Sequence, residues 1–274
     1  MNNKIITFAL GCSAFWGVNT SRAAIMVTYG SPGAMSATVA DAQVEDFNDP
    51  ALLGKANNNV AWNGVGSINS VYVEPGSMYG GANGTACAVQ SEWVGQPIAV
   101  PISTLTLNTP SAYFGLHWAA ADSKNVLSFY EDSILVGQIN ASQFLTGLPS
   151  GYNGNPSLQF KGLDYHEDFA FVNFFGTGGT TWDKVVFSNL GTTGFESDNW
   201  TTRVQPWGQD PNDSGNMPGT PALEIGVPAV PEVPYTGLFM GLGCLAIAGW
   251  NCRRKAPVAA VADKLATCAK AGIV

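Results

Sequence analysis

The stretch NVLSFY-EDS-ILVGQI, residues 125–139, decides the fold class. Two runs rich in β-branched and aromatic residues, 125–130 and 134–139, flank the polar turn residues Glu131, Asp132 and Ser133. This pattern predicts a β-hairpin in which alternate side chains enter a core. The residues that follow, 140–145, predict a single helical turn.

Short runs of the same kind recur on both sides of this hairpin, bounded by Gly, Asn, Pro and Ser, and helical periodicity is scarce. The pattern predicts an all-β fold, a single antiparallel, jelly-roll-like β-sandwich over residues 24–206. Residues 29–79 carry less strand signal and predict one edge strand near 44–47 followed by a long loop. Residues 207–229, rich in Pro, Gly, Asn and Asp, predict a linker. The other expected strands are residues 86–94, 98–107, 112–118, 157–160, 169–175, 184–188 and 200–204.

The N-terminus predicts a secretory signal peptide over residues 1–23. Lys4 precedes an apolar run over residues 5–18, and polar residues follow it. Ser21 and Ala23 place small residues at the −3 and −1 positions of a cleavage site after Ala23.

A second apolar run, residues 235–250, predicts a transmembrane helix, although it is shorter than the ~20 residues that usually span a bilayer. The basic cluster Arg253, Arg254 and Lys255 follows the run and predicts a cytoplasmic side there, so residues 24–229 lie outside. The remaining residues, 256–274, predict a cytoplasmic tail.

The motif before this run is Val230, Pro231, Glu232, Val233 and Pro234. A Pro-Glu motif, an apolar helix and a basic cluster in this order resemble the PEP-CTERM sorting signal, here residues 230–255, of exosortase substrates. The usual third residue is Pro, where this chain has Val233, and 19 further residues follow the basic cluster. The resemblance implies processing by an exosortase and delivery to the surface or matrix of a Gram-negative-type bacterium.

The middle of the chain resembles β-sandwich surface proteins that carry the same sorting tail. The resemblance implies a β-sandwich ectodomain and transfers no catalytic residue. The residues that carry it are YFGLHW at 113–118, Asp122, Asn125, SFY at 128–130, FVNFF at 171–175, DKVVF at 183–187 and FESDN at 195–199.

Charge excludes nucleic acid as a partner. The 274-residue chain has a net charge of −8 and is 12% charged and 46% hydrophobic. Between Ala24 and Pro234, five Lys and Arg stand against 19 Asp and Glu, which gives −14. Nucleic-acid binding needs basic side chains that neutralise phosphates, whereas an acidic domain favours cations.

The few cysteines and histidines argue against disulfides and zinc sites in the exported segment. Of the five cysteines, Cys87 alone lies in the exported segment, so this segment can form no internal disulfide. His117 and His166 are its two histidines, too few for a zinc site with a single cysteine. The sequence also has no Gly-x-Ser-x-Gly nucleophile motif.

Two sets of residues are candidate sites. Early and late strands of a jelly roll often lie side by side, so Glu45 and Asp46 could meet Glu196 and Asp198 in a Ca²⁺ site; exposed carboxylates are the alternative. The run Asp210, Asn212 and Asp213 is a weaker calcium candidate. Most aromatic residues are expected to fill the core, whereas Trp182 and Trp207 follow Gly- or Pro-rich loops and could stack on sugar rings.

These observations together predict a non-enzymatic surface protein that takes part in adhesion, in biofilm or in the organisation of extracellular polysaccharide. A secreted hydrolase acting on a glycan through paired carboxylates is the alternative from another class. A matrix protein with a purely structural role is the third.

Overall fold

The computed structural model describes residues 24–91, 100–145, 148–189, 191, 193–213 and 215–226. In these residues thirteen strands form one sheet, and every pairing between named strands is antiparallel. The strands are β1 (Ala24–Tyr29), β2 (Gln43–Glu45), β3 (Lys55–Trp62), β4 (Gly66–Glu74), β5 (Cys87–Ser91), β6 (Ile102–Ser111), β7 (Tyr113–Ala119), β8 (Asn125–Glu131), β9 (Ile134–Asn140), β10 (Ala170–Thr177), β11 (Trp182–Asn189), β12 (Gly194–Arg203) and β13 (Thr220–Ile225).

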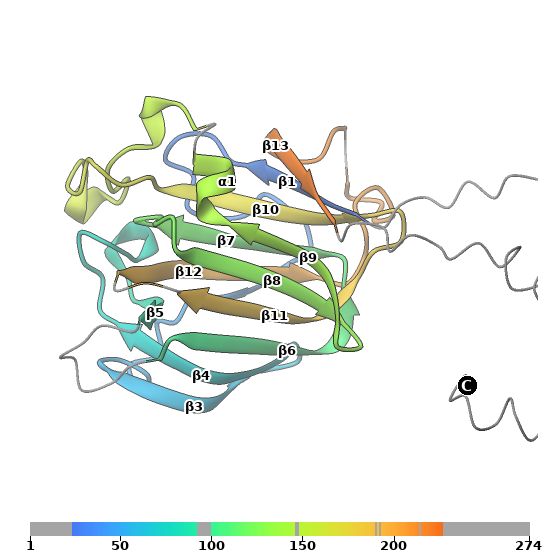
Figure 1. Ribbon diagram of the computed structural model, residues 1–274, viewed down its shortest axis with the longest axis horizontal. Coiled ribbons are helices and arrows are strands. Elements are labelled where there is room, and N and C mark those ends of the chain that lie inside the picture. The colour runs from blue at the N-terminus through green and yellow to red at the C-terminus, as the bar shows by residue number, and fades with distance from the viewer. Residues whose placement is uncertain are drawn as a thin grey trace, which may run out of the picture. The chain divides into compact units, whose positions relative to one another are not determined.

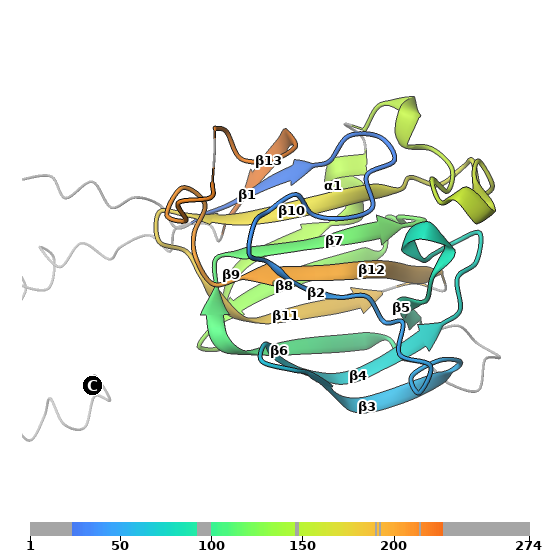
Figure 2. The ribbon, with the colours of Figure 1, turned by 180° about the vertical axis from the view of Figure 1, so that it is seen from behind.

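The sheet folds back on itself, so that its two halves face each other. The strand order is β13-β1-β10-β7-β12-β5-β4-β6-β11-β8-β9, with β2 paired to β12 and β3 paired to β4. Figure 1 shows β8, β9 and β11 in front of β7 and β12. In the opposite view of Figure 2, β7 and β12 are in front. The fold is therefore a nearly closed, sandwich-like antiparallel structure, as the sequence predicts.

Aromatic side chains fill the space between the two halves. Phe114 of β7 packs on Phe129 of β8 and Phe187 of β11, with ring centroids 6.3 and 5.9 Å apart. Phe187 also stacks on Trp200 of β12 at 3.9 Å. Alternate residues of these strands face inward, so rings from opposite halves interdigitate and bury apolar surface.

The first and last strands of the path come close to closing the sheet. Gly137 of β9 lies under Ile25 of β1, and a Cβ at Gly137 would be 2.7 Å from Ile25 Cδ1. Ile225 of β13 approaches the same position at 3.5 Å. Glycine thus gives room for the Ile25 side chain where β9 passes beneath β1 and β13.

A second buried layer lies on the outer face of β7 and β10. Residues 30–42, between β1 and β2, run across this face (Figure 2), and Val39 packs there with Tyr113 and Phe175. The outer residues of β7 are consequently as buried as its inner ones.

Several local predictions are confirmed. The predicted hairpin is β8–β9, and the helical turn is α1 (Ala141–Leu145). The predicted edge strand near residues 44–47 corresponds to β2.

Three predictions are wrong. The loop expected after β2 contains β3 and β4, whose polar residues belong to an edge hairpin. The strand expected at 157–160 is the short 3-10 helix η3 (Leu158–Phe160). The linker expected at 207–229 contains β13, which pairs with β1, so this part of the chain belongs to the sheet. Two further 3-10 turns are η1 (Ala82–Gly84) and η2 (Ser150–Tyr152).

Candidate functional site

A polar groove of about 620 Å³ lies between β2 and β3. Its volume is within the range of small-molecule sites, roughly 300–1,000 Å³. The lining residues are Gln43, Val44, Glu45, Asp49, Leu52, Asn57, Asn58, Asn59, Val60, Ala61, Trp62 and Asn63.

The groove exists because β2 and β3 each pair along a single edge within the described residues. β2 pairs with β12, where Glu45 lies opposite Trp200, and β3 pairs with β4. Phe47, just after β2, packs edge-on against Trp200 at 4.9 Å and ties β2 to the core. The two strands are thus held by separate partners, and residues of both line the groove.

One asparagine of β3 supports the wall from behind. Asn57 is buried, and its Nδ2 donates to the carbonyl oxygens of Leu52 (2.8 Å) and Lys55 (2.9 Å). This side chain fixes the turn that leads into β3, so its role is structural.

The other amides of the groove have unused hydrogen-bonding capacity. Gln43, Asn58, Asn59 and Asn63 are exposed. No hydrogen bond joins their side chains to another described residue. Each amide presents two donor hydrogens and one acceptor oxygen. Together they offer a row of donors and acceptors to a ligand.

Two carboxylates complete the lining. Glu45 Oε1 accepts from the N–H of Phe47 (3.0 Å), and Asp49 Oδ1 accepts from the N–H of Ala51 (2.8 Å). Burial raises the pKa of Glu45, the Phe47 N–H opposes this, and the nearby Asp46 and Asp49 carboxylates raise it further. The lining contains no Lys, Arg or His, so the groove is electrostatically negative.

The strand pairing predicted for the calcium candidate is confirmed, because β2 lies beside β12. The carboxylates nevertheless have separate surroundings. Asp46 Oδ1 accepts from the N–H of Asn48, whereas Asp198 is buried and accepts from the N–H of Ala82 (2.7 Å), the hydroxyl of Thr85 and the N–H of Asn199. Among the described residues no group of three or more His, Cys, Asp or Glu is arranged to hold a metal ion.

Glu196, which is half-buried, and Asp198, which is buried, belong to an acidic layer beneath the loop that joins β4 to β5. Glu74 lies opposite Cys87 across β4 and β5, and Gly80 of the loop lies directly over Cys87 and Glu196. Burial raises the pKa of Glu74 and of Glu196, and the Glu74 carboxylate raises the pKa of Glu196 further. Burial also raises the pKa of the Cys87 thiol well above its usual value, which leaves this cysteine unreactive.

His117 of β7 lies beside this layer, directly across from Asp198 of the neighbouring strand β12. It is fully buried, and neither ring nitrogen has a hydrogen-bond partner among the described residues. Burial lowers the pKa of His117 to about 4, so the ring is neutral at physiological pH.

The two tryptophans predicted to be exposed are not free to stack on sugars. Trp182 is fully buried in the core and packs edge-on against Phe129, because β11 extends two residues further towards its N-terminus than expected. Trp207 packs against Phe175 and lies under the guanidinium group of Arg203.

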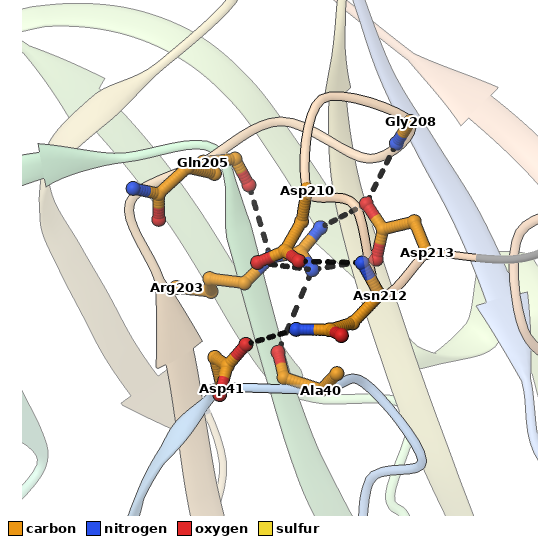
Figure 3. A network of polar contacts seen from close by, with 8 residues as sticks. All are labelled: Ala40, Asp41, Arg203, Gln205, Gly208, Asp210, Asn212 and Asp213. Carbon is orange, nitrogen blue, oxygen red and sulfur yellow. Dashed lines mark hydrogen bonds and ion pairs between the residues drawn. The ribbon is translucent and has the colours of Figure 1, made fainter.

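Arg203 fastens the C-terminal part of the domain (Figure 3). Its Nη1 and Nη2 donate to the two carboxylate oxygens of Asp213 at 2.6 and 3.0 Å, and its Nε donates to the Gln205 carbonyl oxygen. Nη1 also reaches the Ala40 carbonyl oxygen at 3.5 Å, and Asp210 lies 4.0 Å away. Both carboxylate oxygens of Asp213 therefore bind a guanidinium group, so Asp213 is not available as a ligand in the weaker calcium candidate, Asp210, Asn212 and Asp213.

The segments predicted to direct export and sorting lie outside the described residues. These are the signal peptide 1–23, the motif at Val230, Pro231, Glu232, Val233 and Pro234, the apolar run 235–250, and the cluster Arg253, Arg254 and Lys255. Within the described part of the chain, no helix has the length and apolar character needed to cross a membrane.

No protein-family model and no curated protein matches the chain. Among solved structures it is similar to the catalytic domain of a GH87 alpha-1,3-glucanase variant in complex with tetrasaccharides, with 15% identity and a TM-score of 0.28. The match covers 70% of this chain and 31% of that chain, so this protein spans about a third of its length. A likeness of this extent supports neither a shared fold nor a shared activity.

Proposed function

We propose that this protein is an exported, non-enzymatic surface or matrix protein whose sandwich domain binds extracellular polysaccharide in the groove between β2 and β3. The observation that carries the proposal is the groove itself, lined by Gln43, Asn58, Asn59 and Asn63 with unused hydrogen-bonding capacity. Sugar hydroxyl groups both donate and accept, and an amide can satisfy both functions at once.

Binding measurements on wild type and a groove variant test this proposal. The double variant Asn58→Ala with Asn63→Ala removes two amides that make no internal hydrogen bond, so the fold is expected to keep its stability. Each lost hydrogen bond weakens binding by about 1 kcal/mol, so losing both lowers the affinity for a bound oligosaccharide about 30-fold. Glycan arrays identify the ligand, and titration calorimetry measures the loss.

The matched control is Gln209→Ala with Asn216→Ala, which removes two exposed amides outside the groove. The control is expected to bind as wild type does. Equal affinity of the groove variant and wild type would place the ligand elsewhere and contradict the proposal.

A secreted glycan hydrolase is the second candidate, and one observation favours it. Glu45 and Asp49 line the same groove, and Glu45 has the raised pKa that suits a general acid. If wild type releases reducing ends from the bound oligosaccharide and Glu45→Gln does not, the protein is a hydrolase and the non-enzymatic binding role is wrong.

We also propose that residues 230–255 act as an exosortase sorting signal, with a single transmembrane helix at 235–250. The order of the Pro-Glu motif, the apolar run and the basic cluster supports this. The strand order, in which early and late strands alternate, supports the jelly-roll-like topology of the exported domain.

Replacing Pro231 and Glu232 by Ala is expected to retain the protein in the inner membrane, because the exosortase then lacks its motif. Cell fractionation and immunoblotting measure the distribution between membrane and surface. Surface release of this variant at the wild-type level would contradict the sorting proposal. The protein would then reach the surface by a route that does not use this motif.

A further inference from the structure

We infer that the groove between β2 and β3 selects polysaccharides that carry amino groups, such as chains of glucosamine, over neutral chains and rejects acidic ones. This inference rests on the proposed function of the same groove and names the class of its ligand.

The charges of the lining carry the inference. Glu45 and Asp49 are both in the lining, with Asp46 next to Glu45, and no basic residue of the lining compensates them. The carboxylates also keep acceptor capacity. Each accepts one backbone N–H, through a single oxygen, and no described residue donates to the other oxygen. A protonated amine can donate up to three hydrogen bonds to such acceptors.

The shape of the groove suits an extended chain. Residues 57–63 run along its wall, and at about 3.3 Å per residue this wall is about 20 Å long. Several linked sugar units therefore lie beside the amides of Asn58 and Asn63 while an amine faces the carboxylates on β2 and the following turn. Hydroxyl contacts and charge contacts thus come from different parts of the groove.

The electrostatic surroundings of Glu45 favour a cationic ligand. Burial and the carboxylates of Asp46 and Asp49 raise its pKa, and the Phe47 N–H is the one donor that faces it among the described residues. A bound ammonium group favours the charged carboxylate, so binding of the amine is expected to lower the pKa of Glu45.

The test uses the purified full-length protein and three tetramers, of glucosamine, N-acetylglucosamine and galacturonic acid, in titration calorimetry at low salt. Wild type is expected to bind the glucosamine tetramer about tenfold more tightly than the N-acetylated one and to show no binding of the galacturonate. High salt is expected to reduce the preference, because these contacts are partly solvent-exposed.

The variant Glu45→Gln with Asp49→Asn keeps both side-chain acceptors for the backbone N–H groups and removes both charges. It is expected to bind the glucosamine tetramer and the N-acetylglucosamine tetramer with equal affinity. The control Asp132→Asn with Glu224→Gln makes the same change in net charge outside the groove and is expected to keep the wild-type preference.

The outcomes separate the two claims. Binding of the N-acetylated tetramer without a preference for the amine, or a preference that survives in Glu45→Gln with Asp49→Asn, overturns the inference and leaves the proposed function. Failure of wild type to bind any of the tetramers, together with no binding on a glycan array, overturns both.

Discussion

Replacing Arg203 by Met is expected to reduce the free energy of unfolding by about 3–5 kcal/mol. The Arg203 and Asp213 side chains are each 1% exposed and form a bidentate pair. Removing the guanidinium leaves the Asp213 carboxylate without a counter-charge, with the Gly208 N–H as its remaining donor among these contacts, and frees the carbonyl oxygens of Ala40 and Gln205. Urea unfolding, followed by tryptophan fluorescence, measures the loss.

Two further variants show whether the pair itself carries this stability. Arg203→Lys keeps the charge but cannot bind both oxygens of Asp213 in the same geometry, so it is expected to recover only part of the loss. Arg203→Met with Asp213→Asn removes both charges and is expected to be more stable than Arg203→Met alone. A loss below 1 kcal/mol in Arg203→Met would show that the network of Figure 3 does not hold the C-terminal segment.

The second large effect is a dependence of stability on pH that originates at Asp198. Burial raises its pKa to about 7 from an ordinary value of 3.8, against the N–H groups of Ala82 and Asn199 and the Thr85 hydroxyl, while the Asp46 carboxylate raises it slightly. The folded state therefore binds a proton that the unfolded state has lost. The contribution of Asp198 is most favourable below pH 3.8, decreases as pH rises to about 7, and amounts to about 4 kcal/mol in total.

His117 contributes with the opposite sign. Burial lowers its pKa to about 4 from 6.5, so the folded state excludes a proton that the unfolded state binds. Its contribution decreases as pH falls from 6.5 to about 4. The two effects oppose each other in wild type, so variants are needed to separate them.

The measurement is the free energy of unfolding in urea at pH 5 and pH 8 for wild type, Asp198→Asn and His117→Phe. The stability of wild type relative to Asp198→Asn is expected to fall by about 3 kcal/mol between pH 5 and pH 8. The stability of wild type relative to His117→Phe is expected to rise over the same interval. Parallel stability profiles for wild type and Asp198→Asn would contradict the raised pKa of Asp198.

The β-hairpin and the core strands could be predicted because their side chains alternate. In β8, Leu127 and Phe129 belong to the central core cluster, whereas Val126 and Ser128 lie on the opposite face of the strand, where they are buried too. β10 was also predictable, although both of its faces are buried and its sequence is almost continuously apolar.

The groove could not be predicted, because its wall is an edge strand of polar residues. Asn57, Asn58 and Asn59 in succession favour a loop by propensity, and their strand forms because β4 supplies the hydrogen bonds. The run of asparagines is the signal in the sequence, but its meaning depends on β2, which lies beside β12 and far from β3 in pairing order.

The misplaced tryptophan and linker have related causes. A Gly-rich turn precedes Trp182, but a turn does not determine which way the first residue of the next strand points. The Pro- and Gly-rich composition after Trp207 hides Thr220–Ile225, which pairs with the first strand of the domain. Contacts between the two ends of a domain leave little trace in local composition.

A crystal structure of the protein with the N-acetylglucosamine tetramer tests the central claim most directly. We expect the sugar to lie between β2 and β3, with hydrogen bonds from the side chains of Asn58 and Asn63 to its hydroxyl or acetamido groups. An empty groove in crystals grown at a tetramer concentration that saturates binding in solution, with the sugar bound on another face, would contradict the claim.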